Sequence, residues 1–206
     1  MIRLRPGAIV GAYFLHISVF AVNYIVIGKE AYMNNVIIID DAEDVALYAV
    51  EALAASFHVR FCSGNSLYET GCGKSIYIWR TDVLHSLGAE DCIIVLGENV
   101  NAVPSFLPQS ALIIANALNK QQMEILSHKN NNVITCGNLV MDTVSYTSIT
   151  DEKITVSLGR AVVLPDGTEI QPFEKPVRKS TGDRIYPVLA ASALRIALGD
   201  SSFYLR

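Results

Sequence analysis

The sequence lacks most of the features that reveal a function at first sight. It has no run of basic residues: 16 Lys and Arg are outnumbered by 20 Asp and Glu, giving a formal net charge of −4. This balance argues against nucleic-acid binding, because phosphates are bound by clustered Lys and Arg. Cysteines are few and widely spaced (Cys62, Cys72, Cys92 and Cys136) and match no paired zinc-ligand pattern. We expect all four to be reduced thiols, as in a cytosolic protein.

Catalytic signatures are also missing. No GxSxG elbow would expose a nucleophile, and His58, His85 and His128 lie on separate predicted elements. The segment TGCGKS at 70–75 is similar to the end of a phosphate-binding loop. That motif, however, needs a glycine where Tyr68 stands and a buried strand before it. We therefore interpret the segment as a glycine-rich turn.

An apolar stretch, residues 8–27, opens the chain and is long enough to cross a membrane, which takes about 20 apolar residues. The codons of Lys29-Glu30-Ala31 can read AAG GAG GC, a purine-rich bacterial ribosome-binding sequence just ahead of Met33. We predict that translation starts at Met33, that residues 1–32 are a spurious extension, and that the protein is cytoplasmic. The alternative is a membrane anchor; a signal peptide fits less well because its apolar region is shorter.

From position 33 onward the pattern is that of an α/β protein. Short, continuous apolar runs are typical of buried parallel strands, and the helical spacing of apolar residues after the first strand predicts an amphipathic helix. Such an alternation builds a parallel sheet. The predicted elements are strand 36–39, helix 44–57, strand 58–62, loop 63–74, strand 75–80, helix 81–87, strand 92–96, strand 111–115, helix 119–129 and strand 133–137.

Beyond residue 137 the sequence pattern changes. Three stretches, 143–150, 153–164 and 169–177, alternate apolar and polar residues or are rich in β-branched residues, and Asp166-Gly167 is a hairpin-turn signal. They predict an antiparallel meander, followed by an apolar helix over 185–198. We predict one α/β domain over 33–206. Its Rossmann-like, mostly parallel sheet spans 33–137, and a C-terminal antiparallel meander and final helix span 138–206.

Asp40 and Asp41 directly follow the first strand, at the end of the sheet where open α/β proteins bind ligands. Adjacent carboxylates can hold Mg²⁺, or one of them can cap the next helix, which is the interpretation we favour. The stretch 36–60 resembles the opening of a response-regulator receiver domain. That family needs a phospho-accepting Asp at the end of its third strand, where Leu96 stands here.

A second resemblance begins at the strand 111–115. This strand leads to Asn116 and Asn119 and then to a helix, a strand ending at Gly137, antiparallel strands and an Ala-rich helix. Over about residues 111–199 this order resembles the end of the central domain of Mur ligases, the ATP-dependent enzymes that add amino acids to peptidoglycan precursors.

The resemblance implies the fold of that family but not its chemistry. Leu118 replaces an expected acidic residue, and the family's phosphate loop and Mg²⁺-holding Glu have no match. We predict a non-catalytic, Mur-ligase-like binding or regulatory module for a small molecule or a protein partner, without metal or cofactor. The alternatives are a divergent ligase that uses ATP and Mg²⁺ and borrows groups from a partner chain, and a degenerate receiver-like signalling domain. The predicted ligand-binding residues are Asp40, Asp41, Asn116, Asn119 and Gly137.

Overall fold

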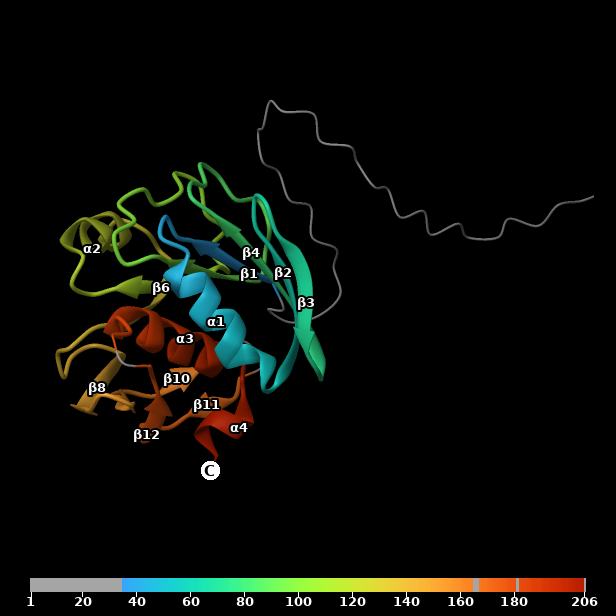
Figure 1. Cartoon of the computed structure of the whole chain (residues 1–206). Coiled ribbons are helices and arrows are strands. Elements are labelled where there is room, and N and C mark those ends of the chain that lie inside the picture. The colour runs from blue at the N-terminus through green and yellow to red at the C-terminus, as the bar shows by residue number, and fades with distance from the viewer. Residues whose placement is uncertain (1–34, 165–166, 181, 206) are drawn as a thin grey trace, which may run out of the picture.

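The structure is a computed structural model that describes residues 35–164, 167–180 and 182–205. The predictions about residues 1–32, including the translation start and the membrane anchor, fall outside these ranges. One ten-stranded sheet runs through the molecule in the order β12-β9-β8-β7-β6-β5-β1-β4-β2-β3 (Figure 1). Its strands are β1 (Asn35–Ile39), β2 (Phe57–Cys62), β3 (Leu67–Gly71), β4 (Lys74–Thr81), β5 (Cys92–Leu96), β6 (Leu112–Asn116), β7 (Asn132–Cys136), β8 (Val144–Ile149), β9 (Lys153–Leu158) and β12 (Phe173–Arg178).

The centre of the sheet is parallel and its C-terminal side is antiparallel. β4, β1, β5, β6 and β7 all run in the same direction, and Ile37 lies in register between Trp79 and Ile94. β9 pairs antiparallel with both β8 and β12. The small hairpin of β10 (Val162–Val163) and β11 (Glu169–Ile170) interrupts this meander at the predicted turn, whose residues 165–166 lie outside the described ranges. The predicted fold class is confirmed.

Alternation of side chains along the strands produces two cores, one on each face. On one face, Ile38 packs with the helices α1 (Asp44–Ala54) and α3 (Ile185–Ala197), which lie against each other (Figure 1). On the other face, Ile37 packs with α2 (Lys120–Ser127) and with the loop that follows β4. A short helix, α4 (Ser201–Tyr204), ends the described chain. None of the described helices is long and apolar enough to cross a membrane.

Two of the four cysteines lie within the apolar core of the sheet. Cys92 and Cys136 are fully buried in strands β5 and β7, and none of the four cysteines forms a disulfide. Burial raises the pKa of the Cys92 thiol to about 11 and raises the pKa of Cys136 as well, so both thiols stay protonated at neutral pH.

Two predicted elements are wrong. Residues 81–87 form no helix: the chain bends at Asp82 and His85, Leu84 and Leu87 are buried, and the Leu87 N–H donates to the carbonyl of Phe106. Residues 63–74 are not all loop, because β3 forms within them and pairs with β2 at the edge of the sheet. An edge strand that is largely exposed needs no alternating apolar pattern, so its sequence resembled a loop.

Candidate functional site at the carboxyl edge of the sheet

The loops that follow β1, β4, β5, β6 and β7 lie together, because the carboxyl ends of parallel strands meet at one edge of the sheet. We call this region the carboxyl edge. It contains the residues after Ile39, Thr81, Leu96, Asn116 and Cys136. Open α/β sheets bind their ligands at such an edge. All five predicted ligand-binding residues lie on it, but the structure gives most of them internal partners.

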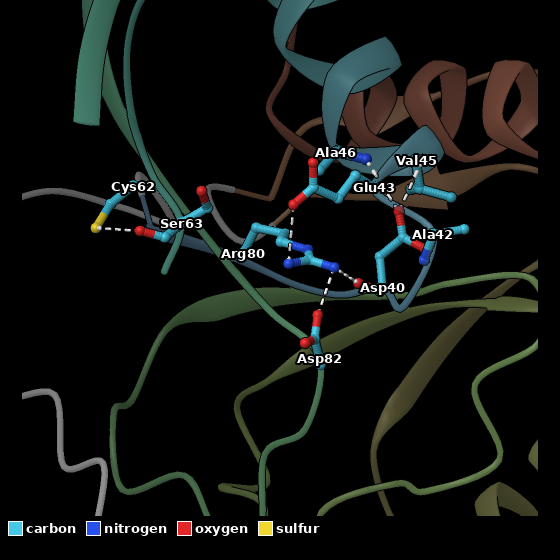
Figure 2. Close-up of polar contacts among 9 residues, drawn as sticks. All are labelled: Asp40, Ala42, Glu43, Val45, Ala46, Cys62, Ser63, Arg80 and Asp82. Carbon is cyan, nitrogen blue, oxygen red and sulfur yellow. Dashed lines mark hydrogen bonds and ion pairs between the residues drawn. The ribbon is translucent and has the colours of Figure 1, made fainter. Parts of the chain in front are cut away.

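Asp40 is held at the N-terminus of α1. Its side chain is 1% exposed, and its carboxylate accepts hydrogen bonds from the N–H groups of Val45 at 2.9 Å, Ala46 at 3.4 Å and Ala42 at 3.3 Å (Figure 2). A carboxylate suits this place, because the first N–H groups of a helix have no partner within the helix and carry a partial positive charge. The predicted capping role of Asp40 is confirmed.

Burial nevertheless raises the pKa of Asp40. Removal from water disfavours the charged form, and this effect exceeds the opposing effect of the three backbone hydrogen bonds. The neighbouring charge of Asp41 acts in the same direction as burial. The group that accepts hydrogen bonds at the N-terminus of α1 is thus the Asp40 carboxylate, a side chain of the protein itself. The N–H groups of the helix partly compensate its charge.

Arg80, from the end of β4, fastens the loop between β1 and α1. Its guanidinium donates to the Asp40 carbonyl at 2.6 Å and forms ion pairs with Glu43 at 3.0 Å and with Asp82 (Figure 2). Glu43 has a φ of 61°, in the left-handed region that non-glycine residues rarely adopt. The ion pair with Arg80 helps to hold this unfavourable backbone, which is the kind of strain that gathers at binding sites.

A second arginine links the start of α3 to the same edge. Arg184 pairs with Asp44 at 3.0 Å and with Glu98 at 3.3 Å. Arg80 and Arg184 are thus engaged by carboxylates. Asp41 is exposed and makes no hydrogen bond or ion pair with the described residues. The surface around the N-terminus of α1 is accordingly acidic.

Asn116 and Asn119 hold the loop that follows β5. The side-chain amide of Asn116 donates to the Glu98 carbonyl at 3.3 Å, and that of Asn119 donates to the same carbonyl at 3.2 Å. Asn119 also caps α2, because its side-chain oxygen accepts from the Gln122 N–H at 3.1 Å. Both amides are used within the protein.

Gln122 completes this network and was not predicted from the sequence. It is fully buried; its amide donates to the carbonyls of Gly97 at 2.8 Å and Val100 at 2.7 Å, and its oxygen accepts from the Asn116 N–H at 3.0 Å. The spacing Asn119-x-x-Gln122 was the available signal, since a cap residue followed three positions later by Gln marks a helix start.

Gly137 allows two loops to touch. A Cβ at this position would lie 2.3 Å from an Asp142 carboxylate oxygen and 2.9 Å from the Ala117 Cβ, so only glycine fits. Asp142 in turn accepts the Leu139 N–H at 2.9 Å. Gly137 therefore shapes the edge, and its N–H is already bonded to the Val144 carbonyl.

The segment 70–75 lies at the opposite end of the sheet. Lys74 begins β4, level with Phe57 at the start of β2, so the glycine-rich turn is far from the carboxyl edge. This confirms that it is not a phosphate loop. Across residues 35–164, 167–180 and 182–205, no three His, Cys, Asp or Glu side chains gather as metal ligands.

Comparison with known structures finds the fold of Mur ligases. A UDP-N-acetylmuramoyl-L-alanyl-D-glutamate–2,6-diaminopimelate ligase matches with a TM-score of 0.50 and 8% identity, over 83% of this chain and 44% of that one. The MurF ligase from Thermotoga maritima in complex with ADP (TM-score 0.46, 9% identity) matches over 82% of this chain and 46% of its own. The UDP-N-acetylmuramate:L-alanyl-gamma-D-glutamyl-meso-diaminopimelate ligase from Neisseria meningitides (0.45, 10%) matches over 80% and 61%.

These matches confirm the predicted resemblance at the level of the fold and extend it beyond residues 111–199 to most of the chain. The chain spans less than two thirds of the length of each of these ligases. No family model and no curated protein matches the sequence.

Proposed function

We propose that the protein is a non-catalytic binding module with a Mur-ligase-like fold, and that the carboxyl edge is its binding surface. One observation carries this proposal: the Asp40 carboxylate occupies the N-terminus of α1. A helix N-terminus at the end of a parallel strand is the usual place for a ligand phosphate in an α/β fold. Here that place is filled by an internal anion, so nucleotide binding is disfavoured.

The charge of the surrounding loops supports the proposal. Asp41, Glu43 and Asp82 are exposed carboxylates on the loops after β1 and β4, and Arg80, the cation beside them, is already paired with Glu43 and Asp82. Two like charges 4 Å apart repel by about 4 kcal/mol at an effective dielectric constant of about 20. Phosphoryl transfer relies on cations and metal around the phosphates, whereas acidic groups dominate here.

The polar side chains of the neighbouring loops also support the proposal. The side-chain amides of Asn116, Asn119 and Gln122 all donate hydrogen bonds to backbone carbonyls of the loop after β5. Their role is to hold the edge in shape. A surface shaped by internal hydrogen bonds suits recognition of a partner through exposed side chains.

The test is thermal unfolding in rising concentrations of ATP with Mg²⁺, up to several millimolar, with sodium chloride of equal ionic strength as control. A ligand of the folded state raises stability by about 2.7 kcal/mol at a hundred times its Kd. We expect no shift of Tm beyond the salt control. A rise that grows with ATP concentration would contradict the proposal and support the divergent ligase.

A titration with Mg²⁺ alone tests the receiver-like alternative. If Asp40 and Asp41 held a cation, Mg²⁺ would raise the Tm of the native protein but not that of an Asp41→Ala variant. We expect the same, flat response from both proteins. Asp41 suits this substitution because it is exposed and has no partner among the described residues.

A further inference from the structure

Four apolar side chains are exposed at one end of the carboxyl edge. Leu118 is 60% exposed, Leu139 51%, Val140 98% and Met141 75%. They belong to the loops after β6 and β7, which meet where Gly137 approaches Ala117. We call these four residues the apolar patch. Adjacent exposed apolar side chains on a folded surface are typical of a docking site.

The backbone beneath the apolar patch is fixed. The Leu139 N–H donates to the buried carboxylate of Asp142 at 2.9 Å, and the Asp142 N–H donates back to the Leu139 carbonyl at 3.0 Å. Arg160 donates to the Met141 carbonyl from the neighbouring meander. The apolar side chains are therefore presented to solvent by an ordered loop, and each of them would gain by burial against a partner.

The other end of the same edge is acidic. Asp41, Glu43 and Asp82 are exposed on the loops after β1 and β4, and we call them the acidic patch. Arg80 pairs with both Glu43 and Asp82 but compensates only one of the two charges, and Asp41 has no counterion within the described chain. The acidic patch therefore favours a cationic partner.

The strand order fixes the distance between the patches. β7 is separated from β1 by β6 and β5, and β4 is the next strand beyond β1. Adjacent strands lie about 4.8 Å apart, so the loop after β7, which carries three of the four apolar side chains, lies about 14 to 19 Å from the acidic patch along the sheet. An α-helix rises about 1.5 Å per residue and covers this span with about 10 to 13 residues.

We propose that the apolar and acidic patches form one docking surface for a basic, amphipathic helix of a protein partner, an inference that rests on the proposed binding function. Apolar side chains of the helix would bury the apolar patch, and Lys or Arg side chains would face the acidic patch. Strand addition is not favoured, because the patches lie on loops at strand ends and offer no strand edge. An anionic membrane surface would be repelled by the acidic patch.

The probe is a fluorescein-labelled 14-residue peptide with Leu along one helical face and Lys elsewhere, compared with a scrambled peptide of the same composition. Binding is measured by fluorescence anisotropy on the full chain. We expect the amphipathic peptide to bind at least tenfold more tightly than the scrambled one.

Val140→Ser with Met141→Ser should weaken binding about tenfold or more, because a few buried apolar contacts dominate such interfaces. Asp41→Asn should weaken it severalfold, most at low salt.

Matched controls separate the patch from general apolar or acidic attraction. Val163→Ser removes an apolar side chain, 67% exposed, from β10 in the small hairpin, and Glu51→Gln removes an exposed acid from α1. Both variants should bind the peptide like the native protein. If the patch variants bind as tightly as these controls, or if the peptide does not bind, the docking surface is disproved.

Vesicles of phosphatidylcholine with phosphatidylserine give a further outcome. Binding to vesicles that depends on Val140, without peptide binding, would overturn the proposal in favour of a membrane surface. The outcome of the peptide experiment is also independent of the outcome of the ATP titration. A Tm response to ATP would contradict the non-catalytic function and leave peptide binding as measured, whereas failure of the peptide with no ATP response would remove only the docking surface.

Discussion

At the scale of single residues, Asp40 is subject to two opposing effects. Its carboxylate satisfies helix N–H groups that would otherwise be buried without partners, and this stabilises the fold. Its burial penalises the negative charge, and this raises the pKa. The two effects are separated by substituting Asp40 with Asn, which has the same shape and accepts a hydrogen bond but carries no charge.

We predict that Asp40→Ala lowers the free energy of unfolding by about 1 to 3 kcal/mol, because buried N–H donors lose their acceptor. Asp40→Asn should lose less than about 1 kcal/mol, since Asn also caps helices well. Urea denaturation at neutral pH measures both. Equal losses in the two variants would mean that the charge, rather than the hydrogen bonds, stabilises α1.

The raised pKa of Asp40 gives a prediction of definite sign. The folded protein binds this proton more tightly than the unfolded chain, whose carboxyl has the ordinary pKa of 3.8. Lowering the pH from neutrality toward 3.8 therefore adds stability to the native protein that Asp40→Asn cannot gain. The difference in free energy of unfolding should move in favour of the native protein as the pH falls. A difference that moves the other way would show that the pKa is lowered in the folded state.

At the scale of elements, the passage from β3 to β4 depends on glycine. β3 and β4 lie on opposite sides of β2, and Cys72 and Gly73 carry the chain between them beneath the turn from α1 to β2. Gly71 has a φ of +76°, and a Cβ there would lie 2.2 Å from the Phe57 carbonyl oxygen. The chain cannot pass so close with any larger residue.

Gly71→Ala should therefore lower the free energy of unfolding by about 2 kcal/mol or more, from steric overlap and left-handed strain together. Gly64→Ala is the control, because a Cβ at that position meets nothing within 4 Å. Thermal and urea unfolding of the two variants provide the comparison. Equal effects would show that the crossover can relax.

The loop after β5 gives a second prediction at this scale. Gln122→Ala removes the acceptor of the Asn116 N–H, whereas the Gly97 carbonyl keeps the Val100 N–H and the Val100 carbonyl keeps the Asn119 amide. We expect a loss of about 1 to 3 kcal/mol on urea unfolding. Gln121→Ala, one residue earlier on the exposed side of α2, should change stability by less than about 0.5 kcal/mol. A small loss in both variants would mean that water replaces the Gln122 side chain.

The elements also show what the sequence could and could not predict. β1 and β5 were predictable because strands covered on both faces are apolar throughout, and the Asp40 cap followed from its place before a helix. β3 was missed because only one side of it pairs. The segment 81–87 was misread because its apolar spacing fits a helix, while Leu84 and Leu87 are buried without forming one. Arg80 was missed because Asp40 and Glu43, which it joins, are distant from it in sequence.

At the scale of the whole molecule, the strand order could not be read from the sequence. Pairing of β1 with both β4 and β5 joins residues far apart in the chain, and local pattern carries no information about it. The order places acids at one end of the carboxyl edge and apolar loops at the other. The Mur-ligase-like fold thus carries exposed acids and exposed apolar side chains at one edge of its sheet.

The central claim is that the N-terminus of α1 is closed to phosphates by Asp40. NMR titration with ATP and Mg²⁺ tests it most directly, through the backbone amide signals of Val45 and Ala46, which donate to the Asp40 carboxylate. We expect these two signals to stay in place up to several millimolar nucleotide. A saturable shift of both would contradict it, since it would mean that a phosphate reaches the helix in spite of Asp40.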